Sequence, residues 1–203
     1  MNRLLLVCIS FAICGSSISN ATAQTAKEVL DKCAATVSAK QGVTADFRME
    51  SAQYGNTSGT IAVKGKMFHA STPMATMWFD GKTQWTYLKK NNEVSVTNPT
   101  ETQLQAINPY NFINMYKKGF KYTMTSSATT YHVHLTATDA TRKVQELFIV
   151  VDKKANTPQE VKMRQGSKWT TFVISNLKAG HLSDTEFQFS SKDFPTAEVI
   201  DLR

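Results

Sequence analysis

The chain has 203 residues, a formal net charge of +7 at pH 7 and 41% hydrophobic residues. This length suits one domain with a substantial core. A basic chain can bind nucleic acid, but no nucleic-acid-binding motif is present, and we expect no such partner. The charge favours attraction to anionic lipid head groups or to an acidic protein partner, while any single lysine pair is also explained by solvated turns and strand ends.

The N-terminus is typical of a secretory signal peptide. Arg3 precedes the apolar run LLLVCISFAICG, and the small residues ATAQ follow at 21–24. We expect cleavage after residue 23, which leaves 203 − 23 = 180 residues, 24–203, as a single exported domain. No later stretch approaches the ~18 consecutive apolar residues of a membrane span, so the sequence predicts a soluble periplasmic product.

The three cysteines bear on export and on redox chemistry. A lipoprotein signal ending at Cys14 is the competing interpretation of the N-terminus, although Ile13 is bulky where such a signal needs a small residue. Cys8 and Cys14 leave with the signal peptide, so the exported chain cannot form an internal disulfide. The remaining Cys33 is either a reactive thiol or, as we expect from its helical surroundings, a small apolar core residue.

The exported chain begins with one amphipathic helix and continues as strands. Residues 25–40 carry apolar residues at helical spacing, and Gly42 follows as a stop signal. From residue 43 the period changes to two, as in a strand with one wet face. Similar segments predict an antiparallel meander that curls into an open or closed barrel: 43–49, 59–64, 67–71, 74–79, 83–89, 93–97, 121–126, 130–137, 144–151, 159–165, 168–176 and 186–190.

One insertion interrupts the strands at residues 98–119. Thr100 and Gln103 resemble a capping box, Asn108-Pro109 restarts a helix, and Gly119 ends it. The second half is rich in apolar residues, which predicts a helical segment that packs on the sheet: Tyr110, Phe112, Ile113, Met115 and Tyr116.

The stretch WFDGKTQWTY (78–87) combines a turn signal with an unusual amount of aromatic surface. Asp80-Gly81 predicts a two-residue type I′ hairpin with residue 79 opposite residue 82. That register places Met74, Trp78, Trp85 and Tyr87 on one face, and Met77 and Phe79 on the other.

Both faces of this hairpin are apolar, so each needs a cover. Helices either pack over the sheet as ordinary core or close reversibly over a cavity that receives an apolar ligand, and the pattern leaves open which face would line it. Flexible methionines suit a surface that adapts to variable alkyl chains: Met49, Met67, Met74, Met77, Met115, Met124 and Met163.

The sequence offers no catalytic site, cofactor site or metal site. His132 and His134 point to one face of a strand, but His69 and His181 lack acidic or cysteine neighbours at ligand spacing. We therefore expect the pair to face solvent. A metal enzyme built on it is the alternative.

Several stretches together resemble the LolA-type outer-membrane lipoprotein carriers. In chain order they are the N-terminal helix, VTADFRME, GTIAVKGKMF, the DGKTQWTY hairpin, the helical insertion and late strands ending in FQF. The similarity covers most of the exported chain, and DGKxxWxY is its most specific motif. The stretches NPYNFINMYKKGF and VIDLR resemble the LolA-like branch of the Bacteroidota.

This resemblance implies a mainly β protein with helices (α+β), an incomplete antiparallel β-barrel covered by a helical lid. It implies a periplasmic chaperone, not an enzyme, that takes acylated lipoproteins or lipids from an inner-membrane ABC exporter to an outer-membrane acceptor. We expect a monomer without a cofactor. The implied acyl-chain-binding residues of wall and lid are Phe47, Met49, Ile61, Val63, Met74, Trp78, Trp85, Tyr87, Phe112, Ile113 and Tyr116.

The chain departs from that family at the position expected to hold the lid. The resemblance implies an arginine after Val63-Lys64, where Gly65 stands, and Arg48 is the candidate substitute. The other open hypotheses are a lipid- or lipoprotein-sensing interaction domain of the same fold without transport activity, and a sheet protein without a cavity.

Overall fold

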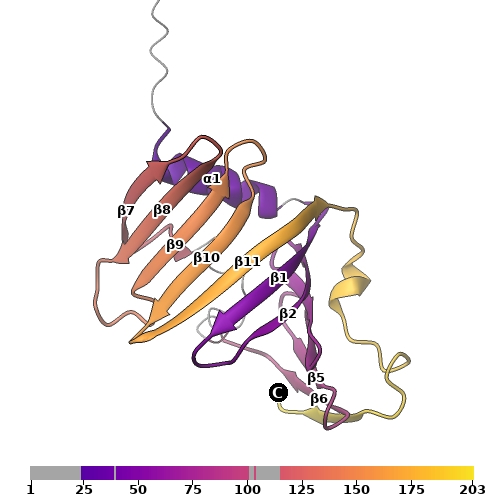
Figure 1. Ribbon diagram of the computed structural model, residues 1–203. Coiled ribbons are helices and arrows are strands. Elements are labelled where there is room, and N and C mark those ends of the chain that lie inside the picture. The colour runs from indigo at the N-terminus through magenta and orange to yellow at the C-terminus, as the bar shows by residue number, and fades with distance from the viewer. Residues whose placement is uncertain (1–23, 39, 101–102, 104–114) are drawn as a thin grey trace, which may run out of the picture.

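The computed structural model describes residues 24–38, 40–100, 103 and 115–203. Twelve strands form one sheet in the order β12-β6-β5-β4-β3-β2-β1-β11-β10-β9-β8-β7 (Figure 1). The elements, in chain order, are α1 (Ala26–Val37), β1 (Val43–Ser51), β2 (Thr57–Lys64), β3 (Met67–Ser71), β4 (Ala75–Phe79), β5 (Gln84–Leu88), β6 (Glu93–Thr97), β7 (Phe120–Ser126), β8 (Thr130–Ala137), β9 (Glu146–Asp152), β10 (Pro158–Gln165), β11 (Lys168–Ala179), the 3-10 helix η1 (Asp184–Phe187) and β12 (Glu198–Asp201).

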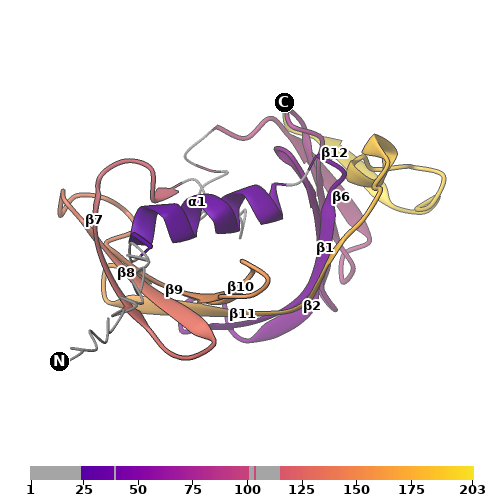
Figure 2. The same cartoon turned by 90° about the horizontal axis from the view of Figure 1, so that it is seen from above.

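The sheet curls around α1 without closing. Neighbouring strands run antiparallel except β12, which pairs parallel with β6, and the two edge strands β7 and β12 are not paired with each other. Figure 2 shows α1 lying across the concave side of the sheet. The predicted fold class, an incomplete antiparallel barrel with a helical cover, is therefore confirmed. Most of the mid-chain insertion, 101–102 and 104–114, lies outside the described residues.

The helix α1 forms where the sequence predicts it. Thr25 and Glu28 form a capping box, in which each side chain accepts a hydrogen bond from the other residue's backbone N–H. The face that α1 turns to the sheet is buried in the main core, with contributions from Val29, Leu30, Cys33, Ala34 and Val37.

Strand alternation gives the sheet a concave and an outer face. Along β1, Val43, Ala45 and Phe47 pack into the core, as predicted, while the intervening polar side chains point outward. Strands β1 to β11 each coincide with a predicted strand. The concave face therefore carries nearly all of the apolar core.

The predicted hairpin register is wrong by two residues. Phe79 pairs with Gln84 and Trp78 with Trp85, so the loop has four residues instead of two. The cause is the side chain of Asp80, whose Oδ1 accepts hydrogen bonds from the backbone N–H of Lys82 (2.9 Å) and Thr83 (2.7 Å). Because strand side chains alternate with a period of two, this shift leaves the strand residues Met77, Trp78, Phe79, Trp85 and Tyr87 on their predicted faces.

The predicted strand at 186–190 is also wrong. Ser183 and Glu186 form a capping box that turns the chain into η1, and Phe187 is fully buried. The segment is tied to the outer face by Lys64, whose Nζ donates to the Asp184 carboxylate (2.7 Å) and to the Leu182 carbonyl (2.8 Å). The chain then ends in β12, a strand that the sequence pattern did not reveal.

At Gly59 the backbone of β2 lies close to that of β3, and a substitution can test this close approach. A Cβ at this position would lie 1.9 Å from the backbone oxygen of Ser71 and 3.2 Å from Cε1 of Phe47. Gly59→Ala should therefore lower the free energy of unfolding by about 2 kcal/mol or more, because backbone must move to admit the methyl group. Urea denaturation measures the change. The control is Ser58→Ala at the exposed neighbouring position, and equal stability of the two variants would contradict the close approach.

Candidate functional site

An apolar cavity of about 350 Å³ lies on the concave face, at the end of the sheet where β1 passes to β2 and β10 passes to β11. Its walls come from β1, β2, β3, β4, β10, β11 and the connections beside them. The lining residues are Phe47, Met49, Tyr54, Thr57, Ala70, Thr72, Ala75, Met77, Met163, Gln165, Thr170 and Phe172.

Strand register brings these residues together from distant parts of the sequence. Met49 lies opposite Phe172 in the pairing of β1 with β11, and Met163 lies opposite Thr170 in the pairing of β10 with β11. On the other side, Ala70 lies opposite Met77. The result is one continuous wall in which bulky flexible side chains alternate with small ones.

The lining residue Thr170 is hydrogen-bonded to a buried neighbour, Ser51. The buried hydroxyls of Ser51 and Thr170 lie 2.9 Å apart, and Ser51 Oγ accepts further bonds from the backbone N–H of Gln53 and Tyr54. Among the described lining residues there is no carboxylate, amine, guanidinium or imidazole. The cavity can therefore recognise a ligand by apolar contact and shape.

The structure divides the predicted binding residues into separate groups. Phe47 and Met49 line the cavity, as the prediction requires of wall residues. Ile61 and Val63 also face the concave side, but they are buried within the core. Met74 lies in the turn between β3 and β4, where it is 70% exposed.

The aromatic hairpin residues lie on the face opposite the cavity. Trp78 stacks on His69 (5.3 Å between ring centroids), and it also contacts Phe189 and Phe194 edge-on. Tyr87 packs on Phe194 at 4.6 Å, and Trp85 shares their face through its pairing with Trp78. The structure therefore does not bring these three residues together with Phe47: the C-terminal segment packs on Trp78 and Tyr87 on the outer face.

Tyr116 is held against α1. Its ring is 1% exposed, and its hydroxyl donates to Asp31 Oδ1 at 2.5 Å. Burial raises the pKa of Tyr116, and a hydrogen bond from Lys27, followed by that from Tyr116, lowers the pKa of Asp31. Tyr122 in turn donates to the Tyr116 carbonyl. Phe112 and Ile113, predicted lid residues, lie outside the described residues.

Arg48, the candidate substitute for the arginine of the resembled family, is exposed on the outer face of β1. It lies on the opposite side of the sheet from α1 and the cavity. Gly65 lies in the exposed turn between β2 and β3 with a φ of +60°. It has no side chain that could replace the arginine of the resembled family. Neither residue supplies a contact on the concave face.

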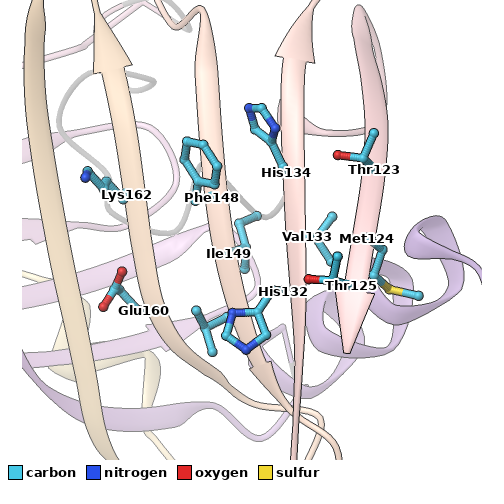
Figure 3. Close-up of a pocket in the computed structure, with 11 residues that line it drawn as sticks. Thr123, Met124, Thr125, His132, Val133, His134, Phe148, Ile149, Glu160 and Lys162 are labelled. Atoms are coloured by element: carbon cyan, nitrogen blue, oxygen red, sulfur yellow. The ribbon is translucent and has the colours of Figure 1, made fainter. Parts of the chain in front are cut away.

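The histidine pair lies in an outer-face groove of about 490 Å³ across β7 to β10 (Figure 3). His134 stacks on Phe148 at 4.1 Å, and its Nε2 lies 3.4 Å from the Glu146 carboxylate, which Arg164 also binds. His132 is exposed and lies 2.9 Å from the Thr130 hydroxyl. Within the described part of the chain, no cluster of three or more His, Cys, Asp or Glu residues could hold a metal ion.

Sequence reasoning missed three of the main cavity residues: Met77, Met163 and Phe172. Met77 was assigned to the correct face, and Met163 was among the candidate adaptable methionines. Their convergence depends on the pairing of β1 with β11, which are separated by more than a hundred residues. No local signal in the sequence specifies that pairing.

Comparison with known proteins places the chain in a family. The family described as "Outer membrane lipoprotein carrier protein LolA" matches residues 11–167, so the chain belongs to the LolA family. No curated protein sequence gives a significant match. This member of the LolA family is an open barrel with an apolar cavity on its concave face.

The solved structures that are similar to this chain include the following three. An uncharacterized conserved protein from Thermus thermophilus has a TM-score of 0.60 at 12% identity over 88% of this chain and 99% of its own, which shows a shared fold. A LolA superfamily protein from Nitrosomonas europaea has a TM-score of 0.44 at 11% identity over 82% of this chain and 99% of its own. The lipoprotein LppX of Mycobacterium tuberculosis has a TM-score of 0.44 at 9% identity over 75% of this chain and 96% of its own. Among the helices described in this chain, none has the length and apolar character needed to cross a membrane.

Cys33 is confirmed as a core residue of α1. It is 2% exposed, and burial raises the pKa of its thiol to about 12. The thiolate is the reactive form of cysteine, so both access and ionisation are suppressed in the folded protein. The protein without residues 1–23 contains no other cysteine.

We predict that Ellman's reagent at pH 8 leaves the native thiol unmodified over the time in which the unfolded chain, in concentrated guanidinium chloride, reacts completely. The absorbance of the released thiolate measures the reaction. The unfolded chain is its own control for reagent quality. Rapid stoichiometric labelling of the native protein would show that Cys33 is an accessible nucleophile.

Proposed function

We propose that this protein is a non-enzymatic periplasmic carrier that binds the acyl chains of lipoproteins, or of other lipids, in the concave cavity and moves them from the inner to the outer membrane. The observation that carries the proposal is the cavity wall, in which Phe47, Met77, Met163 and Phe172 meet without a charged neighbour. Membership of the outer-membrane lipoprotein carrier family supports it.

The size of the cavity fits one alkyl chain. A methylene group fills about as much space as a water molecule in the liquid, roughly 30 Å³, so 350 Å³ accommodates about 12 methylenes. At ~0.8 kcal/mol per buried methylene, such a chain gains on the order of 10 kcal/mol on leaving water. A carrier has to supply much of this free energy without retaining the chain against the receiving membrane.

The methionines of the wall suit such intermediate affinity. Met49, Met77 and Met163 line the cavity, and their unbranched side chains can fill the space around chains of different length or leave it. A wall of rigid β-branched residues would fit a single ligand shape. The proposed cargo is accordingly a class of acylated molecules, and the protein needs no cofactor to bind it.

The route of transport defines the proposed partners. The protein would be exported through its N-terminal signal peptide, receive cargo as a monomer from an inner-membrane ABC lipoprotein exporter, and pass it to an outer-membrane acceptor. Family membership and the signal-like sequence of residues 1–23 support this route. The cavity at one end of the sheet would give both partners access from the same side.

A matched pair of methionine variants tests cargo binding. Met77 lines the cavity, whereas Met67 lies on the outer face of the adjacent strand β3. Met77→Gln places an amide against the alkyl chain without hydrogen-bond partners and should weaken the binding of a fluorescent fatty acid about tenfold. Met67→Gln should leave the dissociation constant unchanged, and fluorescence titration measures both.

Two results would contradict the carrier proposal. If neither methionine variant alters the affinity while both remain folded by circular dichroism, acyl chains do not enter this cavity. If the unmodified protein takes up no fatty acid and no acylated peptide, the cavity is packing space and the carrier function is wrong.

A further inference from the structure

The cavity lies at one end of the sheet, and four of the connections at that end lie nearest to it. They are the residues 52–56, 72–74, 89–92 and 166–167, which join β1 to β2, β3 to β4, β5 to β6 and β10 to β11. Strand pairing places them at the same end, since Ser51 pairs with Thr170 and Ala75 with Leu88, and the backbone N–H of Lys89 donates to the Met74 carbonyl. We call this end the cavity rim. Figure 1 shows it along the lower edge of the sheet, where the β1 arrow ends.

Large apolar side chains are exposed on the cavity rim. Tyr54 is 58% exposed, Met74 is 70% exposed and Leu88 is 38% exposed. Tyr54 also lines the cavity, and Leu88 pairs with the lining residue Ala75. These three residues come from three different connections or strand ends, and together they surround the cavity with apolar surface.

The turn that presents Met74 is held firmly. Thr72 Oγ1 accepts hydrogen bonds from the backbone N–H of Met74 (3.3 Å) and Ala75 (3.0 Å). Lys89 binds the same turn twice, through its backbone N–H to the Met74 carbonyl (3.1 Å) and through Nζ to the Thr72 carbonyl (2.7 Å). The exposure of Met74 is therefore a property of an ordered turn, and its side chain needs no rearrangement to meet a partner.

The four connections of the cavity rim carry lysine but no aspartate or glutamate. Lys89 and Lys90 lie in the connection between β5 and β6, and the exposed Lys168 follows the connection between β10 and β11. Carboxylates at this end, Glu50, Glu93 and Glu198, lie in the adjoining strands. Apolar side chains with lysines beside them are complementary to an anionic bilayer, whose interface takes up Met, Tyr and Leu and attracts each lysine.

We propose that the cavity rim docks the protein on an anionic membrane surface, with Tyr54, Met74 and Leu88 entering the interface and Lys89, Lys90 and Lys168 contacting lipid phosphates. This goes beyond the proposed carrier function, because the membrane contact is made without cargo. The contact also orients the molecule, so that the cavity faces the bilayer.

Vesicle co-sedimentation tests the docking surface. The protein without residues 1–23, which retains every described element, is mixed with vesicles of phosphatidylcholine alone or of phosphatidylcholine with phosphatidylglycerol. Binding should appear with the anionic vesicles and fall as salt is raised. Lys90→Gln with Lys168→Gln should reduce the partition coefficient about fivefold per lysine. Met74→Asp should reduce it about tenfold or more.

Controls at the opposite end of the sheet match these variants in chemistry. Lys66→Gln with Lys154→Gln removes two exposed lysines, and Leu202→Asp adds the same charge at an apolar residue that is 63% exposed. These variants should bind vesicles like the unmodified protein. Fatty-acid binding is measured on the same samples, and the variant lacking Lys90 and Lys168 should retain it.

Two results would overturn the docking proposal. One is retained fatty-acid binding without any binding to anionic vesicles, which would leave the carrier function standing and assign the rim to a protein partner. The other is an equal loss of vesicle binding in the rim variants and the controls, which would reduce the effect to net charge. Loss of fatty-acid binding alone, with vesicle binding intact, would instead reject the carrier function and retain the docking surface.

Discussion

The structure depends on the covering of one concave apolar face. Strand alternation places nearly the whole core on this face, and a sheet that curls without closing cannot bury it alone. The helix α1 buries one end of it through Val29, Leu30, Cys33 and Val37. No residue of α1 is among the described residues that line the cavity at the other end. The helix therefore stabilises the fold by covering part of the concave face, and the cavity lies in the part that α1 does not line.

The two halves of the outer face differ in how their aromatic side chains are covered. Over β3 to β5 the aromatic hairpin is covered by the chain's own C-terminal segment, in which Phe189 and Phe194 pack on Trp78 and Tyr87. Over β7 to β10, polar and charged side chains surround Phe148 and His134 in an open groove. Among the described residues, the aromatic cluster around Trp78 therefore packs within the protein, on the face opposite the cavity.

The sequence predicted what depends on local pattern. Period-two alternation identified β1 to β11, and helical spacing of apolar residues with Gly42 as a stop identified α1. The alternation of strand side chains also predicted that Met77 and Trp78 face opposite sides of the sheet. Three features depended on contacts that no local pattern encodes. Asp80 added two residues to the hairpin loop by bonding backbone N–H groups, Ser183 and Glu186 turned a predicted strand into η1, and the pairing of β1 with β11 brought Met49 to Phe172.

The central claim is that an acyl chain occupies the concave cavity. The most direct measurement is photo-crosslinking with a fatty acid that carries a diazirine near its methyl end, followed by mass-spectrometric mapping of the labelled residues. The account predicts labels on the cavity wall, at Met49, Met77, Met163 and Phe172. Labels confined to the outer face, at Trp85 or Phe148, or an unlabelled protein under conditions that saturate binding, would contradict it.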